Sequence, residues 1–313
     1  MLAGPRKLHQ IARMERPAFP VSHALLALAA IVVWGSNFVV IKVGLNHVPP
    51  LTFAALRFTF AFLPAAVFIR RPKVGWRNLA LYGLLIGVGQ FGLLYIAMQS
   101  LISPGLASLV VQMQAFFTVG LAMWLAGEKV RPYQLAALAV AGAGLGWLIA
   151  HSGAEVTPLG LVLVLAAGLS WAGGNMAAKA NGGVNMLAYV VWAAPFSAVP
   201  LFGLALAKEG WPAVSGAIVH ADATVWAAVA WQSAGNTLFG YAVWGWLLAR
   251  HPAATISPLS LLVPVVGMGA SALVLGEGLP AWKLTAAALV LGGLALNVFW
   301  PAVSRRWLPA PAA

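Results

Sequence analysis

The stretch HALLALAAIVVWGSNFVVIKVG, residues 23–44, decides the class of this protein. This stretch contains a single Lys or Arg, Lys42. The stretch is long enough to cross the hydrocarbon core of a bilayer as a helix, which takes about 20 apolar residues. Further stretches of the same kind follow it. The sequence therefore predicts ten membrane helices, at residues 23–44, 50–69, 78–99, 104–126, 132–151, 158–178, 186–207, 223–248, 253–275 and 281–302.

The composition of the whole chain agrees with this class. Charged residues make up 8% of the 313 residues and hydrophobic residues 62%, whereas soluble domains carry roughly 25% and 45–50%. Proline stands at or near the start of six segments, where its missing N–H costs a helix nothing: Pro50, Pro104, Pro132, Pro158, Pro252 and Pro280. We expect an all-α integral membrane protein with no extramembrane domain.

The positive charges predict the orientation. Of the 18 Lys and Arg residues, 14 lie before the first segment, after the last, or in alternate gaps between segments. The opposite side holds only Lys208 and Lys283, and none of the six Asp and Glu residues lies within a segment. By the positive-inside rule, both termini are predicted to be cytoplasmic. The net charge of +12 is thus a topology signal, and we do not expect nucleic-acid binding.

Most site chemistries find no support in the sequence. The chain has no Cys, and its six His residues lie in gaps or at segment ends without ligand-like spacing, so no metal site is expected. Gly87, Gly89 and Gly92 match the letters of a dinucleotide fingerprint. They lie within a predicted membrane helix with no preceding strand, so close helix packing or a cavity wall is the better interpretation, and no cofactor is expected. The predicted spans contain no pair of His with Asp or Glu that could act as a nucleophile's base, so the sequence does not suggest an enzyme.

The chain repeats its landmarks. Trp34 and Lys42 are matched by Trp171 and Lys179, and the pattern around helix 104–126 returns around helix 253–275. A chance duplication of short motifs is the alternative. Because five helices are an odd number, the second copy would cross the membrane in the opposite sense, an architecture typical of transporters. The expected parts are a cytoplasmic segment 1–22, repeats 23–152 and 153–303 as two inverted five-helix units, and a cytoplasmic tail 304–313.

Polar and aromatic side chains at helical spacing mark the faces that line a pathway. They place the first, third, fourth, sixth, eighth and ninth helices around a cavity. Each amide could instead form an interhelical hydrogen bond, and each ring could be core packing. The candidate substrate-binding residues are Trp34, Asn37, Arg57, Gln90, Gln112, Trp171, Asn175, Asn236, Tyr241 and Ser260.

Two cations lie within the spans toward their external ends. Lys42 and Arg57 could extend to the interface or bond helix-end carbonyls, or one of them could attract the carboxylate of a zwitterionic substrate. No Asp, Glu or His lies at midspan, where proton coupling usually needs one. Facilitated diffusion or exchange is therefore favoured over proton antiport. Glu128 and Glu277 are expected to pair with nearby Lys or Arg residues such as Lys283.

Helices 132–151 and 281–302 carry glycines in place of interior polar groups. Gly144 and Gly293 are examples. Small residues allow close packing of membrane helices. These two helices are predicted to be peripheral, with a homodimer contact as an open alternative.

The motifs of the chain resemble those of a known family. They are WGSNFVVIKVGL at 34–45, Leu56-Arg57-Phe58, GLASLVVQ at 105–112, SWAGGN at 170–175 and PLSLLVPVVG at 258–267. Over about residues 23–302 the chain resembles the drug/metabolite transporter superfamily, and within it the EamA-type exporters.

The resemblance implies a function as well as a fold. It implies a ten-helix carrier of the bacterial inner membrane, built as inverted repeats, that exports amino acids or related metabolites by alternating access. Exporters of cysteine and O-acetylserine are the most similar subgroup, and aromatic amino acid exporters of the YddG type are relatives. Broad specificity for neutral amino acids, including aromatic or sulfur-containing ones, is expected. The alternative is a carrier for lipophilic cations or drugs.

Overall fold

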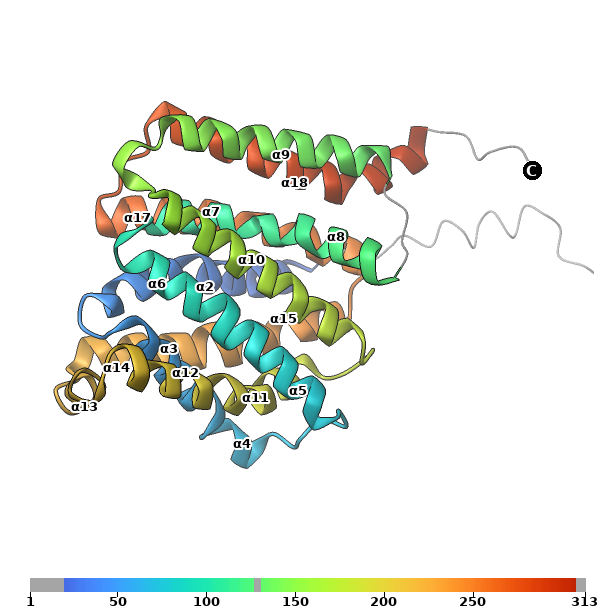
Figure 1. The fold of residues 1–313 in the computed structure, drawn as a ribbon. Helices are drawn as coiled ribbons and strands as arrows, with labels where there is room; N and C mark the ends of the chain where they lie inside the picture. Colours follow the sequence, from blue (N-terminus) through green and yellow to red (C-terminus); the bar gives the residue numbers. More distant parts are fainter. Residues whose placement is uncertain (1–19, 127–130, 308–313) are drawn as a thin grey trace, which may run out of the picture.

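The computed structural model describes residues 20–126 and 131–307, and these form a bundle of helices (Figure 1). Nine helices in this part of the chain are long and apolar enough to cross a membrane, or ten if one bent pair counts as a single span. The helical, multi-span class predicted from the sequence is thereby confirmed. Most of the predicted segment 1–22 and of the tail 304–313 lies outside the described residues, as does Glu128.

The first half of the chain folds into five spans, three of them interrupted. Their elements are α2 (Val21–Leu45); α3 (Pro50–Phe62) with α4 (Ala65–Phe68); α5 (Trp76–Gly83), η1 (Leu84–Gly92) and α6 (Leu93–Ser100); α7 (Pro104–Val110), η2 (Val111–Met113) and α8 (Gln114–Ala126); and α9 (Pro132–His151).

The second half follows the same order after the short turn η3 (Gly153–Glu155). Its elements are α10 (Pro158–Lys179); α11 (Met186–Ala193) with α12 (Pro195–Lys208); α13 (Trp211–Val219); α14 (Ala223–Ala230), η4 (Trp231–Phe239) and α15 (Gly240–Leu248); α16 (Ala253–Ile256), η5 (Ser257–Leu261) and α17 (Leu262–Leu275); and α18 (Ala281–Trp307).

The interruptions recur at matching places in the two halves. The second span of each half breaks at a proline, Pro64 or Pro195, because a proline inside a helix removes a backbone donor. The third span of each half contains a nine-residue π-helix, η1 or η4. The fourth contains a 3₁₀ segment, η2 or η5. Segments of these kinds inside α-helices are frequent at functional sites and hinges.

Two boundaries differ from the sequence prediction. The gap assigned to residues 208–222 contains the helix α13, which meets the next helix at 94°, and the tenth candidate span exists only when these two are joined. Polar residues of η4, such as Gln232 and Asn236, lower the hydropathy of residues 223–248. The last helix also continues to Trp307, so the predicted tail from residue 304 begins as helix.

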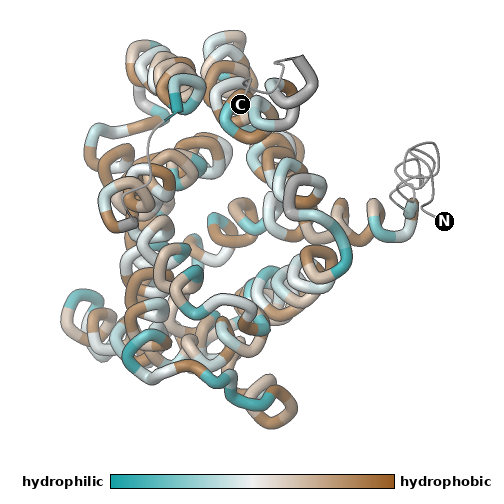
Figure 2. Tube along the Cα trace, turned by 90° about the vertical axis from the view of Figure 1, so that its right-hand side faces the viewer, coloured by the Kyte–Doolittle hydropathy of each residue, from teal (hydrophilic) through white to brown (hydrophobic). Residues whose placement is uncertain are grey.

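The bundle has two ends, which we name by the chain. The terminal face carries the start of α2 and the end of α18, and the distal face lies opposite, at the left of Figure 1. The distal face holds residues 46–49, 101–103, 152–157, 209–222 and 276–280. Figure 2 looks onto the terminal face, where hydrophilic residues gather in loops and helix ends.

The helices α9 and α18 lie side by side along one edge of the bundle (Figure 1). Their glycines allow a close approach: a Cβ on Gly144 would stand 2.8 Å from Leu289 Cβ, and one on Gly293 would stand 2.5 Å from Ala137 O. Most of α9 is otherwise exposed, as a lipid-facing helix would be. The peripheral position predicted for this pair agrees with the structure.

Candidate functional site

A cavity of about 470 Å³ lies among the helices. Pockets of about 300–1,000 Å³ are typical for small molecules. Its wall comes from α2, the spans that contain η1, η2, η4 and η5, and α10, with Met186 of α11 added. Its polar and aromatic lining residues are Trp34, Asn37, Phe38, Tyr82, Gln90, Phe91, Ser108, Gln112, Gln114, Trp171, Asn175, Asn236, Tyr241, Trp244, Ser257 and Ser260.

Nine of the ten sequence-predicted site residues lie on this wall, and Arg57 is the exception. The sequence reasoning missed Tyr82, Gln114 and Met186. Gln114 follows Gln112 by two residues, and such neighbours do not share a face of a regular α-helix. Gln112 lies in the 3₁₀ segment η2 and Gln114 begins α8 directly after it, and the 3₁₀ segment changes the turn per residue there. No signal in the sequence marked that change.

Arg57 lies just behind the wall. Its side chain is 1% exposed, so it neither extends to the interface nor lines the cavity. Its Nη2 donates to Asn236 Oδ1 at 3.1 Å and to Thr237 Oγ1 at 3.1 Å, and its Nη1 donates to Tyr95 Oη at 3.3 Å. The guanidinium carbon stands 3.9 Å from the centre of the Phe91 ring. The expectation that Arg57 extends outward is wrong, because η4 supplies buried acceptors for it.

Aromatic rings form one side of the cavity. Trp34 packs against Trp244 and Tyr241, with ring centres 5.0 and 5.9 Å apart. Its Nε1 donates to Asn236 O at 3.0 Å, which fixes the indole against η4. Gly240 makes room for it, since a Cβ there would stand 2.3 Å from Trp34 Nε1. The rings are thus held in place while a face of each remains toward the cavity.

Amides form another side of the cavity, and they differ in their bonding. Asn175 Nδ2 donates to Gln114 Oε1 at 3.1 Å, so these two side chains hold one another. Gln90 and Gln112 make no hydrogen bond to another described side chain or backbone group, although they are only 5% and 9% exposed. Buried polar groups normally find partners. Gln90 and Gln112 therefore offer donors and acceptors to a molecule in the cavity.

The glycine run in η1 serves packing. A Cβ on Gly87 would stand 2.1 Å from Ser197 Cβ, and one on Gly89 would stand 1.9 Å from Ser170 Oγ. These glycines hold α12 and α10 close to η1 while Gln90 points to the cavity. The interpretation of this run as close helix packing is confirmed.

The cavity runs from Ile41 and Ser108, which lie toward the distal ends of their spans, toward the terminal face. Tyr82, Met186 and Trp244 lie near helix ends on that face. Polar contacts join the helices at the distal face instead. Lys42 Nζ donates to the carbonyls of Met98 and Gln99, at 3.3 and 2.8 Å, so the helix-end interpretation of Lys42 is confirmed.

Carboxylates complete the closure of the distal face. Glu277 accepts from Ser103 Oγ at 2.5 Å, from Gly105 N at 3.0 Å and from Lys283 Nζ at 2.9 Å. Lys283 is fully buried and also reaches Glu155 at 2.6 Å. Glu209 accepts from Leu51 N and from both donors of Thr52. Glu277 and Glu209 thus bind the N-termini of α7 and α3, where a negative charge is favoured.

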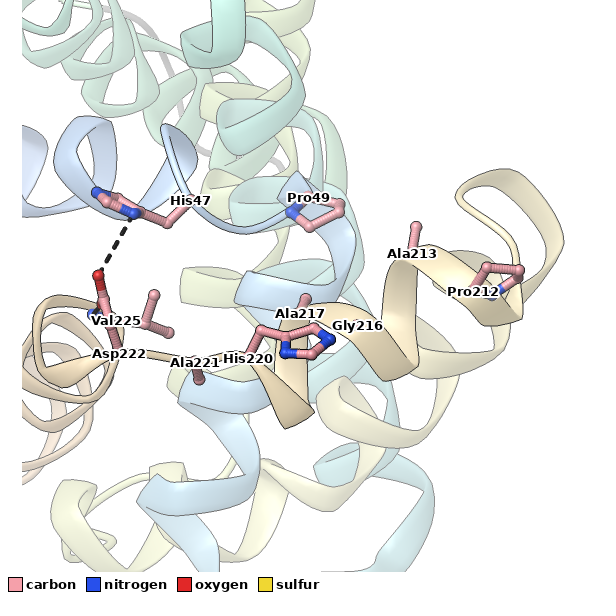
Figure 3. Close-up of a pocket in the computed structure, with 10 residues that line it drawn as sticks. All are labelled: His47, Pro49, Pro212, Ala213, Gly216, Ala217, His220, Ala221, Asp222 and Val225. Carbon is pink, nitrogen blue, oxygen red and sulfur yellow. Dashed lines mark hydrogen bonds and ion pairs between the residues drawn. The ribbon is translucent and has the colours of Figure 1, made fainter.

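A second hollow of about 250 Å³ opens on the distal face (Figure 3). His47 and Asp222 point toward one another across it, with 3.7 Å between Nδ1 and Oδ2, and His220 lies beside them. Both partners are about half exposed, at 42% and 52%. Exposed ion pairs of this kind contribute little. The central cavity, of about 470 Å³, is the larger of the two and the better candidate for a substrate site.

The structure also brings together two histidines that the sequence separates. His23 Nδ1 and His251 Nε2 lie 2.7 Å apart near the terminal face. Among the described residues, no group of three His, Cys, Asp or Glu side chains could hold a metal ion. This contact links α2 to the start of the span that contains η5.

The cavity suits binding better than catalysis. No Asp, Glu, His, Lys or Arg of the described residues lines it. General acid–base and nucleophilic catalysis need such groups. Amides, hydroxyls and rings around an enclosed space can instead select and release a small molecule.

The chain is similar to bacterial proteins of known name. It is 42% identical over 280 residues to a "Probable amino-acid metabolite efflux pump" of Salmonella typhimurium, covering 88% of this chain and 94% of the relative. A protein of the same name from Escherichia coli is 42% identical over 281 residues, with the same coverage. A "Probable terminal-alkyne amino-acid exporter" of Streptantibioticus cattleyicolor is 26% identical over 288 residues, or 88% of this chain and 93% of that protein.

Comparisons of fold and family agree. A solved crystal structure aligns with a TM-score of 0.62 over 93% of this chain and all of the other, at 19% identity, which is a likeness in fold alone. The EamA-like transporter family matches residues 21–150 and, separately, residues 158–299. The resemblance predicted from the motifs is confirmed, and the protein is a multi-pass membrane exporter rather than an enzyme. The chain belongs to the EamA-like transporter family.

Proposed function

We propose that this protein exports amino acids and related metabolites from the bacterial cytoplasm through the central cavity, by alternating access. The observation that carries the proposal is the cavity wall: amides, hydroxyls and rings enclose it, and no charged side chain of the described residues lines it. A neutral zwitterion fits such a wall better than an ion, since a buried unpaired charge is costly. The names of the relatives at 42% identity point to the same substrate class.

Broad specificity is part of the proposal. The rings of Trp34, Trp171 and Trp244 offer large apolar contact to aromatic or sulfur-containing side chains. Gln90 and Gln112 offer donors and acceptors that no described residue occupies. A wall of this kind accepts several neutral side chains, because few of its groups demand one particular shape.

Two inverted repeats would supply the movement. The matching interruptions of the two halves support this arrangement, as does the separate family match to each half. The boundaries 23–152 and 153–303 follow from it. In the state described here the cavity lies toward the terminal face and polar contacts hold the distal face together. Alternating access would break these contacts and close the terminal side.

In the proposed orientation the terminal face lies in the cytoplasm. Arg70, Arg71, Arg77, Lys179 and Arg250 lie at that face, whereas four of the six carboxylates of the chain lie at the distal face: Glu155, Glu209, Asp222 and Glu277. This distribution follows the positive-inside rule. Exchange or facilitated diffusion is the proposed energetics, because the wall offers no carboxylate or imidazole for a proton. A homodimer contact along α9 and α18 stays a prediction.

A lipophilic cation is the second candidate substrate. The three rings Trp34, Tyr241 and Trp244 favour it, since a cation is attracted to the faces of aromatic rings. The wall has no carboxylate to neutralise such a cation, which makes the zwitterion the better candidate.

Counterflow in proteoliposomes tests the proposal. Vesicles loaded with one unlabelled amino acid should accumulate the labelled form, for neutral, aromatic and sulfur-containing amino acids alike. The panel should include a cationic amino acid and a lipophilic cation. Accumulation of the lipophilic cation without any amino acid would contradict the proposal in favour of the second candidate.

A further inference from the structure

The guanidinium of Arg57 carries a charge that no described carboxylate balances. Its hydrogen-bond partners are the neutral side chains of Tyr95, Asn236 and Thr237. Its Nε finds no acceptor within the described residues. Glu155, Glu209, Asp222 and Glu277 are all engaged at the distal face. An unbalanced cation inside a membrane protein is costly and usually marks a functional site.

The positive charge stands directly behind the cavity wall. Phe91 and Asn236 line the cavity, and both also contact the guanidinium, through the ring face and through Oδ1. Thr237 and Tyr95 accept hydrogen bonds from the guanidinium on other sides, Tyr95 in turn donates to Gln232, and none of the three lines the cavity wall. The field of the charge therefore reaches the cavity across one amide and one ring.

The amide of Asn236 has only one orientation that fits. An arginine donates hydrogen bonds and accepts none, so the Asn236 atom that faces Nη2 must be the carbonyl oxygen. The NH₂ group then points away from Arg57. The NH₂ group donates no hydrogen bond to another described residue. It is not one of the fully buried polar atoms without a partner, so part of its surface is accessible. Its remaining direction is the cavity, which Asn236 lines at 7% exposure.

We propose that Arg57 and Asn236 form a relay that holds the carboxylate of the exported molecule. Asn236 is the contact residue and donates its NH₂ group to a carboxylate oxygen. Arg57 is a positioning residue: it fixes the direction of the amide and adds attraction for negative charge without touching the ligand. The inference rests on the proposed function, because it names the group by which that cavity recognises its substrate.

The relay explains why the wall can do without a cation of its own. A lysine on the wall would bind a carboxylate tightly and slow its release. An amide backed by a buried charge binds more weakly and still favours carboxylates over amines that lack one. The ring of Trp34 lies beside Asn236 and packs against Tyr241 and Trp244, and these three rings line the cavity, where they can face the ammonium group and the side chain.

The test is a change of selectivity produced by Asn236→Asp. The aspartate keeps the size of the side chain and pairs with Arg57, so the buried charge is balanced and the fold should survive. Its second oxygen turns toward the cavity and repels a carboxylate. The assay is uptake into proteoliposomes of three matched probes: phenylalanine, the corresponding amine phenethylamine, and the acid 3-phenylpropionate.

In Asn236→Asp we expect phenylalanine and 3-phenylpropionate uptake to fall at least 20-fold, while phenethylamine uptake changes less than threefold or rises. Arg57→Lys keeps the charge but cannot hold both Asn236 and Thr237, so its loss should be partial, about 3- to 10-fold, and again confined to the carboxylates. Ser271→Ala is the control, since it removes a buried hydroxyl away from the cavity wall. It should change no probe by more than twofold.

Equal losses for all three probes in Asn236→Asp would overturn the relay, as would wild-type protein that moves phenethylamine but no carboxylate. The two proposals fail separately. Wild-type uptake of 3-phenylpropionate without phenylalanine, with selectivity lost in Asn236→Asp, would refute amino acid export and support the relay. Conversely, the wild-type protein could show phenylalanine counterflow while Asn236→Asp reduces phenylalanine uptake no more than phenethylamine uptake. That result would support amino acid export and refute the relay.

Discussion

Replacing Glu277 with alanine should loosen the distal face of the bundle. Glu277 is 10% exposed and accepts hydrogen bonds from Ser103 Oγ and Gly105 N of the first half. A hydrogen bond to a charged group contributes about 1.5–3 kcal/mol. Even at the lower end, the two contacts together contribute about 3 kcal/mol to the closed distal face, and 1.4 kcal/mol is a factor of ten in an equilibrium. If the halves separate here during transport, the equilibrium should shift about 100-fold toward the distal-open state.

The consequence can be measured by thiol labelling. The chain has no Cys, so a single reporter at Ile41 has no background. Ile41 lies on the cavity wall near the distal end of α2 and is fully buried. A membrane-impermeant maleimide added to intact cells should label Ile41→Cys at least tenfold faster when Glu277→Ala is present. Lys283 keeps its contact with Glu155 in that variant, so its charge stays paired.

The matched control is Asn185→Ala. Asn185 caps its own helix α11 at the terminal face by accepting a hydrogen bond from Ala188 N, and this bond does not connect the two halves of the chain. It should lower stability by about 1 kcal/mol without changing the labelling rate. If folded protein with Glu277→Ala and Ile41→Cys is labelled at a rate within twofold of that of Ile41→Cys alone, the reasoning is refuted. Rapid labelling of the reporter alone would contradict the proposed orientation.

Three further changes test separate parts of the structure. In detergent, Gly293→Val should lower the free energy of unfolding by about 1–3 kcal/mol, because a Cβ at this position meets Ala137 O at 2.5 Å. The control is the neighbouring Gly292→Val, where a Cβ meets nothing within 4 Å, and it should leave the free energy of unfolding of the monomer unchanged. Gln112→Leu should reduce counterflow at least fivefold with an unchanged Tm, while Gln232→Leu, which loses a fully buried bond to Tyr95, should lower the Tm. Asp222→Ala should cost about 1 kcal/mol, measured by thermal unfolding, through loss of the cap on Val225 N, with transport retained.

Local sequence was enough to predict the spans because each is decided by its own apolar length. The eighth span is the instructive case, since the polar residues of η4 that weaken its hydropathy are the ones that contact Arg57 and line the cavity. The cavity wall was also largely predictable. Trp34 and Asn37 share a helix face by spacing alone, whatever their partners are.

The sequence misjudged residues whose surroundings come from distant segments. Arg57 was expected to reach outward or to attract a substrate carboxylate. Its side chain does not reach outward but is buried behind the cavity wall, because its partners Asn236 and Thr237 lie 179 and 180 residues away in the sequence. Gln114 was missed because η2 changes the helical turn beside it. The contact between His23 and His251 spans 228 residues and left no local pattern.

The apolar stretches alone predicted that this chain crosses a membrane many times, where most of the crossings lie, and which side chains lie on polar faces. These properties follow from the cost of placing polar groups in hydrocarbon, which acts on each segment separately. Only the tertiary structure decided which polar groups bond one another and which stay available. That choice depends on contacts between helices, and it leaves Asn236 with its carbonyl held by Arg57 and its NH₂ group turned to the cavity.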